Sequence, residues 1–239
     1  MSTTETTEAL RPEPRPNPRL EQTVEVAVFL FLIVPSLILS LFTVQFGNLG
    51  FVITAVSTIF RDLGLVALIL FFLWRNGEPV GRIGWIAGNP WREIFLGIGL
   101  FIPTFFFAGL VEQVLRAAGL SSPTAPSPSF LTPSGTAQVI LATILVIVVA
   151  IAEETIFRGY LTLRFRSIIG SIPGAILLSS VIFAIGHGYE GEAGVITVGL
   201  IGVIFALVYV WRGSLVAPVT MHFLQDFLGI VLVPLLLHR

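Results

Sequence analysis

Long apolar runs divide most of this chain, and they restrict its fold more than any other feature of the sequence. A helix needs about 20 apolar residues to cross a bilayer. The runs cover residues 24–46, 49–74, 94–114, 136–157 and beyond, 172–187, 193–211 and 214–237. The run at 172–187 is short, and Arg61-Asp62 interrupts the second run, either as a charge pair turned to the interior or as a break between two helices. We therefore expect an all-α transmembrane bundle of about seven helices, within a range of roughly six to eight.

The composition is that of an integral membrane protein. Of 239 residues, 55% are hydrophobic and 11% are charged, and the mean hydropathy is +0.95. Soluble domains carry about 25% charged residues. The net charge of -1 gives no indication of a nucleic-acid partner. Cysteine is absent, which excludes disulfides, thiolate metal sites and a Cys nucleophile.

The length suits one domain. Residues 1–20 contain closely spaced prolines. Because proline lacks a backbone donor and disfavours helix in the residue before it, we expect this segment to be a disordered cytoplasmic tail. Residues 21–239 should form a single transmembrane domain. Arg residues concentrate before the first apolar run and in alternate loops after it, which predicts a cytoplasmic N-terminus. The expected location is the bacterial cytoplasmic membrane, with the lipid bilayer as a partner.

Three polar clusters lie within or at the ends of apolar runs. They are residues 153–158 (Glu-Glu-Thr-Ile-Phe-Arg), 183–187 (Phe-Ala-Ile-Gly-His) and 222–226 (His-Phe-Leu-Gln-Asp). An ionisable residue at bilayer depth costs about 2.5–3.5 kcal/mol on an insertion scale. A chain that retains several of them there is expected to use them.

The helix lengths allow these clusters to meet. If the chain turns at Ser171, then Glu153 and His187 lie about 27 Å and 24 Å of helix from that turn. His222 lies about 14 Å of helix after the turn at Gly213. All three clusters can therefore share one depth, in the cytoplasmic half of the membrane.

Helical spacing predicts the local pairs. Glu154 and Arg158 are four residues apart and can form an ion pair, whereas Glu153 is about 100° around the helix and stays free. His222 and Asp226 have the same spacing and should point into one cavity.

The residues of the three clusters resemble the motif set of the CPBP intramembrane proteases. The patterns Glu-Glu-x-x-x-Arg, Phe-x-x-x-His and His-x-x-x-Asn/Asp occur in that order within residues 136–234, the expected catalytic core. The family includes the type II CAAX prenyl endopeptidases and the bacteriocin-processing or immunity (ABI) proteins. The resemblance implies an endopeptidase that hydrolyses membrane-associated peptides or lipidated proteins, either prenylated CAAX-type or bacteriocin-like.

By this resemblance, Glu153 looks like the general base that activates water, helped by His187. His222 and Asp226 look like the pair that stabilises the oxyanion. Some family members carry Asn where this chain has Asp226. Because a carboxylate cannot donate a hydrogen bond, Asp226 either is protonated or orients His222 as the donor.

The remaining site residues have supporting roles. The resemblance implies that Glu154 and Arg158 form a supporting ion pair. We expect Phe157 and Phe183 to contribute to substrate binding, and the ring of Phe183 can shield His187 from water. Arg61-Asp62 matches no family motif, and a structural role is favoured there.

The His-Glu-x-x-His pattern is absent, so this is not an ordinary zincin. No cofactor is expected, because Glu153 cannot easily be both a metal ligand and the base. The alternative is a Zn²⁺ site made by Glu153, His187 and His222, since two His and one Glu ligate zinc elsewhere. Two other functions stay open at this point. One is a proton-coupled transporter, because intramembrane ionisable residues also form relays. The other is a non-catalytic membrane immunity or scaffold protein.

The Arg distribution predicts the topology. A reporter fused after Ser127 should be extracytoplasmic, and one placed within residues 77–91 should be cytoplasmic. Alkaline phosphatase and fluorescent-protein fusions at both points measure this. The opposite reading at both positions would reverse the orientation.

Overall fold

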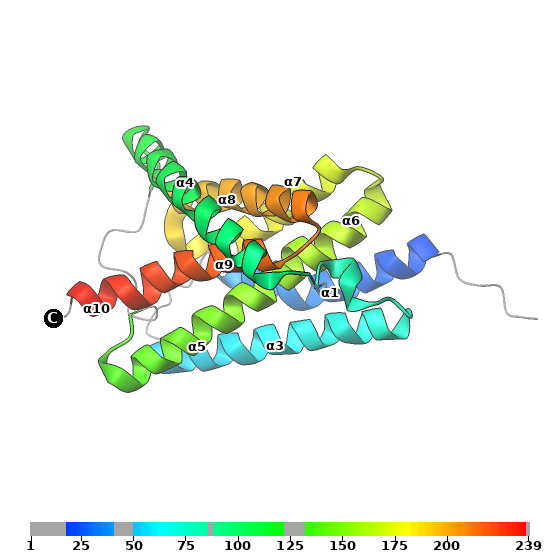
Figure 1. The fold of residues 1–239 in the computed structure, drawn as a ribbon, viewed down its shortest axis with the longest axis horizontal. Helices are drawn as coiled ribbons and strands as arrows, with labels where there is room; N and C mark the ends of the chain where they lie inside the picture. Colours follow the sequence, from blue (N-terminus) through cyan, green and yellow to red (C-terminus); the bar gives the residue numbers. More distant parts are fainter. Residues whose placement is uncertain (1–17, 41–49, 86–87, 122–131, 238–239) are drawn as a thin grey trace, which may run out of the picture.

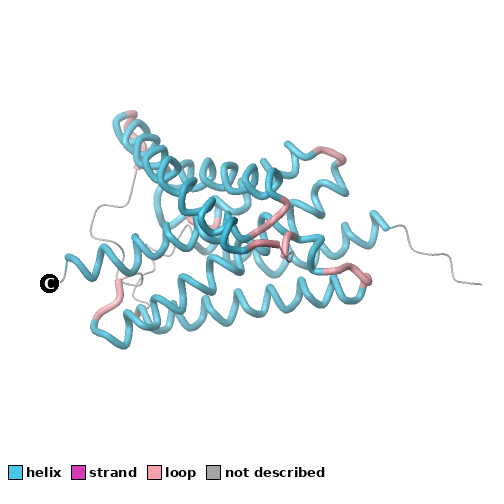
Figure 2. The backbone as a smooth tube through the Cα atoms, in the orientation of Figure 1, coloured by secondary structure: helices cyan, strands magenta, loops and turns pink. Residues whose placement is uncertain are grey.

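The computed structural model describes residues 18–40, 50–85, 88–121 and 132–237, and these residues form helices joined by short turns (Figure 2). No strand occurs in these ranges, so the all-α prediction is confirmed. The first half contains α1 (Pro18–Ser40), α3 (Phe51–Arg75), η2 (Val80–Ile83) and α4 (Pro90–Ala117). The second half contains α5 (Gly135–Glu153), η4 (Glu154–Leu161), α6 (Thr162–Ile169), α7 (Ile172–Ile185), η5 (Gly188–Glu190), α8 (Gly191–Arg212), α9 (Val216–Asp226), η6 (Phe227–Leu232) and α10 (Val233–Leu237).

The helix count agrees with the expected seven. Within the described ranges, 6 helical segments are long and apolar enough to cross a membrane, and the shorter α7 is the seventh apolar helix. The helix α3 is continuous through Arg61-Asp62, so that pair is not a break. The predicted tail, residues 1–20, lies outside the described residues up to residue 17. Residues 18–20 form the first turn of α1, and a proline is well suited to the first helical position.

The helix η4 lies at the centre of the bundle (Figure 1). It contacts α3, α5, α6, α7 and α8, and α9 packs between α4 and α5. All eight residues of η4 are buried. Both η4 and η6 are π-helices, a rare form that occurs often at functional sites. The carbonyl of Phe157 accepts hydrogen bonds from Ser179 Oγ at 2.6 Å and Thr162 Oγ1 at 2.8 Å. These hydroxyl groups satisfy a backbone carbonyl of the π-helix where no water is needed as a partner.

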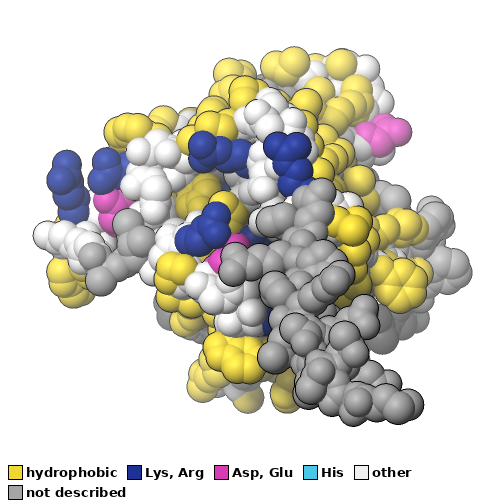
Figure 3. All heavy atoms as spheres, turned by 90° about the vertical axis from the view of Figure 1, so that its right-hand side faces the viewer, with side chains coloured by type: hydrophobic (Ala, Val, Ile, Leu, Met, Phe, Trp, Pro, Cys, Tyr) yellow, Lys and Arg dark blue, Asp and Glu magenta, His cyan; other side chains and the backbone are white. Residues whose placement is uncertain are grey.

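One end of the bundle carries a network of buried ion pairs. Glu25 on α1 accepts from Arg75 at 2.6 Å, and Arg164 on α6 lies 2.8 Å from Glu78 and 3.4 Å from Glu25. Figure 3 views this end, where several Arg side chains lie at the surface. At the opposite end, the amide of Ala193 donates to the Ser121 carbonyl at 2.9 Å. The Arg-rich loops thus share one end, as the sequence predicts, and the cytoplasmic assignment of that end stays a prediction.

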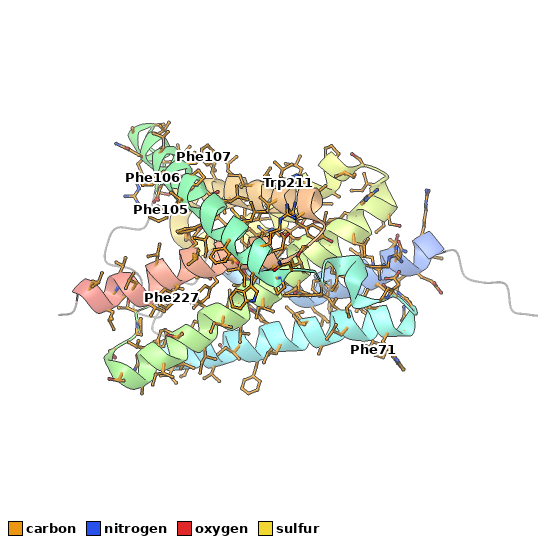
Figure 4. All side chains as sticks on the ribbon, viewed as in Figure 1. Phe71, Phe105, Phe106, Phe107, Trp211 and Phe227 are labelled. Atoms are coloured by element: carbon orange, nitrogen blue, oxygen red, sulfur yellow. The ribbon has the colours of Figure 1, made fainter. Side chains whose placement is uncertain are left out.

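The outer surface is apolar. Large exposed side chains include those of Phe71, Phe105, Phe106 and Trp211, which are labelled in Figure 4. A soluble protein rarely exposes so many aromatic rings together, whereas a bilayer accommodates them. Trp85 and Tyr160 do not belong to this outer layer, because Trp85 donates to Thr155 Oγ1 at 3.0 Å and Tyr160 is fully buried.

Close approach of α4 and α9 depends on Gly97. A Cβ at this position would lie 2.8 Å from the carbonyl oxygen of Ala217 and 2.7 Å from Thr220 Cβ. We expect Gly97→Ala to lower the Tm by several degrees, since overpacking costs about 1–3 kcal/mol. Gly99→Ala on the same helix is the matched control, because a Cβ there meets nothing within 4 Å. Thermal unfolding in detergent measures both. Equal Tm values for the two variants would contradict the close packing of α4 on α9.

Candidate active site

The carboxylate of Glu154 connects two of the three polar clusters. Glu154 is the first residue of η4 and is completely buried. Its Oε1 accepts a hydrogen bond from Arg158 Nη1 at 2.8 Å, so the ion pair that the spacing predicts is present. The same oxygen lies 2.8 Å from Nδ1 of His222 on α9. A single carboxylate oxygen on η4 therefore links this helix to α9.

His222 faces three carboxylates. Its Nδ1 contacts Glu154, and its Nε2 lies 3.4 Å from Asp226 Oδ2 and 3.8 Å from Glu153 Oε2. The ring is buried. Surrounding negative charge stabilises the protonated imidazolium, in which both ring nitrogens are donors. His222 is thus placed to donate a hydrogen bond to an anion near Glu153.

Glu153 has a different environment from its neighbour Glu154. It is the last residue of α5, and its side chain is 14% exposed. Its Oε2 atom is buried and makes no hydrogen bond with any described residue. This oxygen therefore keeps lone pairs with which it can accept a proton from water.

The ring orientation of His187 follows from its hydrogen bond. Nδ1 lies 3.0 Å from the carbonyl oxygen of Phe183, one helical turn earlier. A carbonyl only accepts, so Nδ1 carries the hydrogen and Nε2 keeps the lone pair. His187 is half-buried just after the end of α7. In this state its Nε2 is a proton acceptor.

Phe183 lies among all three polar clusters. Its ring centroid is 4.6 Å from that of His187 and 6.0 Å from that of His222. The guanidinium carbon of Arg158 lies 4.1 Å from the same centroid, a cation–π contact. Phe157 packs edge-on against Phe183 at 5.1 Å. Both phenylalanines are buried in the main core, so they form the wall of the site, and their expected contact with substrate stays a prediction.

The structure adds residues that the sequence analysis did not assign to the site. Asp62 on α3 is buried and close enough to Glu153 and His222 to interact electrostatically with both. The sequence feature that could have indicated a functional position for Asp62 is its place inside an apolar run, where an acidic residue is costly. Tyr189 stacks near His187 with a centroid distance of 5.9 Å. Glu190 is half-buried and interacts with His187 and Asp226. No sequence pattern marks these two loop residues.

The alternative zinc site would take its ligands from Glu153, His187 and His222. Across the described ranges, no group of three or more His, Cys, Asp and Glu side chains is arranged to hold a metal ion. The nitrogen Nδ1 of His187 is occupied by the Phe183 carbonyl, and Nδ1 of His222 by Glu154. These bonds leave Nε2 of each histidine for a further contact, so the expected absence of a cofactor and the alternative Zn²⁺ site of Glu153, His187 and His222 both stay predictions.

A protein-family model matches part of this chain. Residues 135–228 match the family model described as type II CAAX prenyl endopeptidase Rce1-like. This match supports the resemblance to the CPBP family of CAAX-type proteases. The match begins with α5 and ends within η6, so it contains all three polar clusters and leaves α1, α3 and α4 outside. The Rce1-like family is a peptidase family, and the match supports a CAAX-type intramembrane protease. Searches of curated proteins and of solved structures gave no match.

The different environments of the two glutamates predict different effects on stability. Glu154→Gln leaves the buried Arg158 guanidinium without its carboxylate, and breaking such a pair costs about 3–5 kcal/mol. Glu153→Gln removes no hydrogen bond to a described residue and should change the Tm little. Thermal unfolding of both variants in detergent makes the comparison. A larger Tm loss in Glu153→Gln would mean that the structural and chemical roles are exchanged.

Proposed function

We propose that this protein is an intramembrane endopeptidase in which Glu153 and His187 activate water and His222 stabilises the oxyanion. The observation that carries the proposal is the arrangement around His222. Oε2 of Glu153, which makes no hydrogen bond with a described residue, lies 3.8 Å from Nε2 of the buried His222. Glu154 holds the other ring nitrogen of His222, Nδ1. A proton acceptor and a hydrogen-bond donor are thus neighbours, as hydrolysis of an amide requires.

The proposed reaction uses these groups in turn. A water held by Glu153 Oε2 and His187 Nε2 attacks the carbonyl carbon of the scissile bond, and its proton passes to one of these acceptors. The C–O bond forms, and the carbonyl oxygen becomes an oxyanion that accepts a hydrogen bond from His222 Nε2. The tetrahedral intermediate then collapses and the C–N bond breaks. The proton taken from water passes to the leaving nitrogen, which regenerates the base.

Asp226 and the Glu154–Arg158 pair orient the donor. Glu154 holds Nδ1 of His222, and Asp226 lies 3.4 Å from Nε2 on the same helix. In this role Asp226 remains ionised and favours the imidazolium form of His222. This is the second of the two roles that the sequence leaves open for Asp226. The cation–π contact of Arg158 with Phe183 fixes the guanidinium behind the site.

The substrate class that fits best is a membrane-anchored peptide. The site lies on helices that span the apolar layer, so a scissile bond reaches it most readily from a segment that is itself held at the membrane. Prenylated CAAX-type peptides are the first probes, because the matched family is described by that activity. Bacteriocin-like leaders are the second. With the Arg-rich end in the bacterial cytoplasm, the substrate would enter from the cytoplasmic leaflet.

Replacement of the base tests the peptidase function against a non-catalytic scaffold of the same fold. A farnesylated CAAX peptide and a bacteriocin-type leader peptide are incubated with purified protein, and products are measured by mass spectrometry. Glu153→Gln should lower the cleavage rate at least about 100-fold, which is the usual range for loss of a general base. Glu192→Gln is the control, since this exposed carboxylate in the first turn of α8 contacts only Ser121 in the described part of the structure. Unchanged cleavage in Glu153→Gln would defeat this mechanism. Absence of cleavage by the wild type on both probes would favour the scaffold.

A further inference from the structure

Arg61 has an unusual position for a charged side chain. It lies near the middle of α3, about 15 Å of helix from Phe51 and about 21 Å from Arg75. Its side chain is 41% exposed. An Arg that faced lipid at this depth would cost several kcal/mol. The exposed part of Arg61 is therefore expected to face a polar space.

The interactions of Arg61 indicate which polar space its exposed part faces. Its Nε donates to Asp62 Oδ1 at 2.8 Å, and neither Nη group makes a hydrogen bond with a described residue. The guanidinium interacts electrostatically with Glu153 of α5 and with Tyr189 beside His187. The guanidinium of Arg61 is thus fixed through Nε on the buried Asp62 and lies within electrostatic range of the candidate active site.

Arg61 differs from the other fixed cation of the site. Arg158 is 1% exposed and is engaged by Glu154 and by the rings of Phe183 and Phe205. Within the described residues, Arg61 is therefore the arginine of the site with N–H groups still accessible to a ligand. Most of the other ionisable residues of the candidate site are acids, namely Asp62, Glu153, Glu154, Glu190 and Asp226.

We propose that Arg61, positioned by Asp62, binds a carboxylate of the peptide substrate and so selects which peptides are cleaved. The two Nη groups of a guanidinium match the two oxygens of a carboxylate. A carboxylate that entered a site so rich in acids would be repelled unless a cation received it. Asp62 is a positioning residue in this arrangement, because its buried carboxylate fixes Nε and leaves the outer nitrogens to the ligand.

The depth of Arg61 favours a peptide carboxylate over a lipid headgroup. Phosphates of lipids lie near the ends of a spanning helix, whereas Arg61 lies about 15 Å from the nearer end of α3. The substrate's terminal α-carboxylate and an acidic side chain share the same chemistry. Arg61 lies outside residues 135–228, so the family match assigns it no role. The inference rests on the proposed peptidase function.

Three forms of one farnesylated peptide distinguish these carboxylates: the free acid, the C-terminal carboxamide, and the carboxamide with Glu as its last residue. We expect wild-type protein to cleave the free acid with a kcat/KM at least about tenfold above that of the carboxamide. In Arg61→Gln the KM for the acid should rise to that for the carboxamide while kcat stays similar. Arg61→Lys should retain part of the preference. A preference for the Glu-bearing carboxamide alone would identify a side-chain carboxylate as the ligand.

Arg75→Gln is a matched control. Arg75 is on the same helix, is 47% exposed and also uses one nitrogen to contact a buried carboxylate, that of Glu25. This variant should keep the preference for the acid. Because Arg61→Gln leaves Asp62 unpaired, the double variant Arg61→Gln/Asp62→Asn is measured as well, with Tm values for all proteins. Loss of preference in the double variant at a wild-type Tm separates recognition from folding.

Direct binding keeps this test independent of catalysis. Fluorescence anisotropy in nanodiscs measures the three peptides on Glu153→Gln protein, with and without Arg61→Gln. Absence of cleavage by the wild type would defeat the proposed function, whereas tighter binding of a carboxylate form that disappears with Arg61→Gln would still support the role of Arg61. Equal binding of the three peptides, binding of none, or a preference that survives Arg61→Gln would overturn it.

Discussion

The hydrogen bonds to one oxygen of Glu154 hold the candidate site together. This buried carboxylate contacts Arg158 on its own helix and His222 on α9, at 2.8 Å each. In a low-dielectric interior each of these charges would be costly alone, and together they largely neutralise one another. Arg158 in turn lies over the ring of Phe183 on α7. The orientation of three helices thus depends on charges that are acceptable only in each other's presence.

The backbone around this carboxylate departs from the α-helix at two points. Glu153 is the last residue of α5 before the π-helix η4, and Asp226 is the last residue of α9 before the π-helix η6. A π-helix changes the angular position of the residues that follow it. Both transitions occur beside His222, where Glu153 and Asp226 approach Nε2. Of the carboxylates at these two junctions, Glu153 and Asp226 are partly exposed, whereas Glu154, the first residue of η4, is completely buried.

The elements outside the matched domain complete this site. The domain supplies all three motif clusters, but α3 contributes the buried Asp62 and the exposed Arg61 beside Glu153. Spacing alone predicted the Glu154–Arg158 pair, because residues four apart share a helix face. The same reasoning could not place Asp62, Tyr189 or Glu190, since their neighbours come from other helices. Glu190 is half-buried and interacts electrostatically with His187 and Asp226, which no pattern within its own segment indicates.

The sequence by itself determined the class of fold and the approximate helix boundaries, because the length and composition of an apolar run are enough to require a spanning helix. It also determined which side chains are too costly at bilayer depth to be there without a use. The tertiary structure decided that His222 lies between three carboxylates, that η4 and η6 are π-helices, and that α3 continues through Arg61-Asp62. These features depend on contacts between residues far apart in the chain, such as His222 with Glu154, and periodicity within one helix carries no information about the partner that another helix presents.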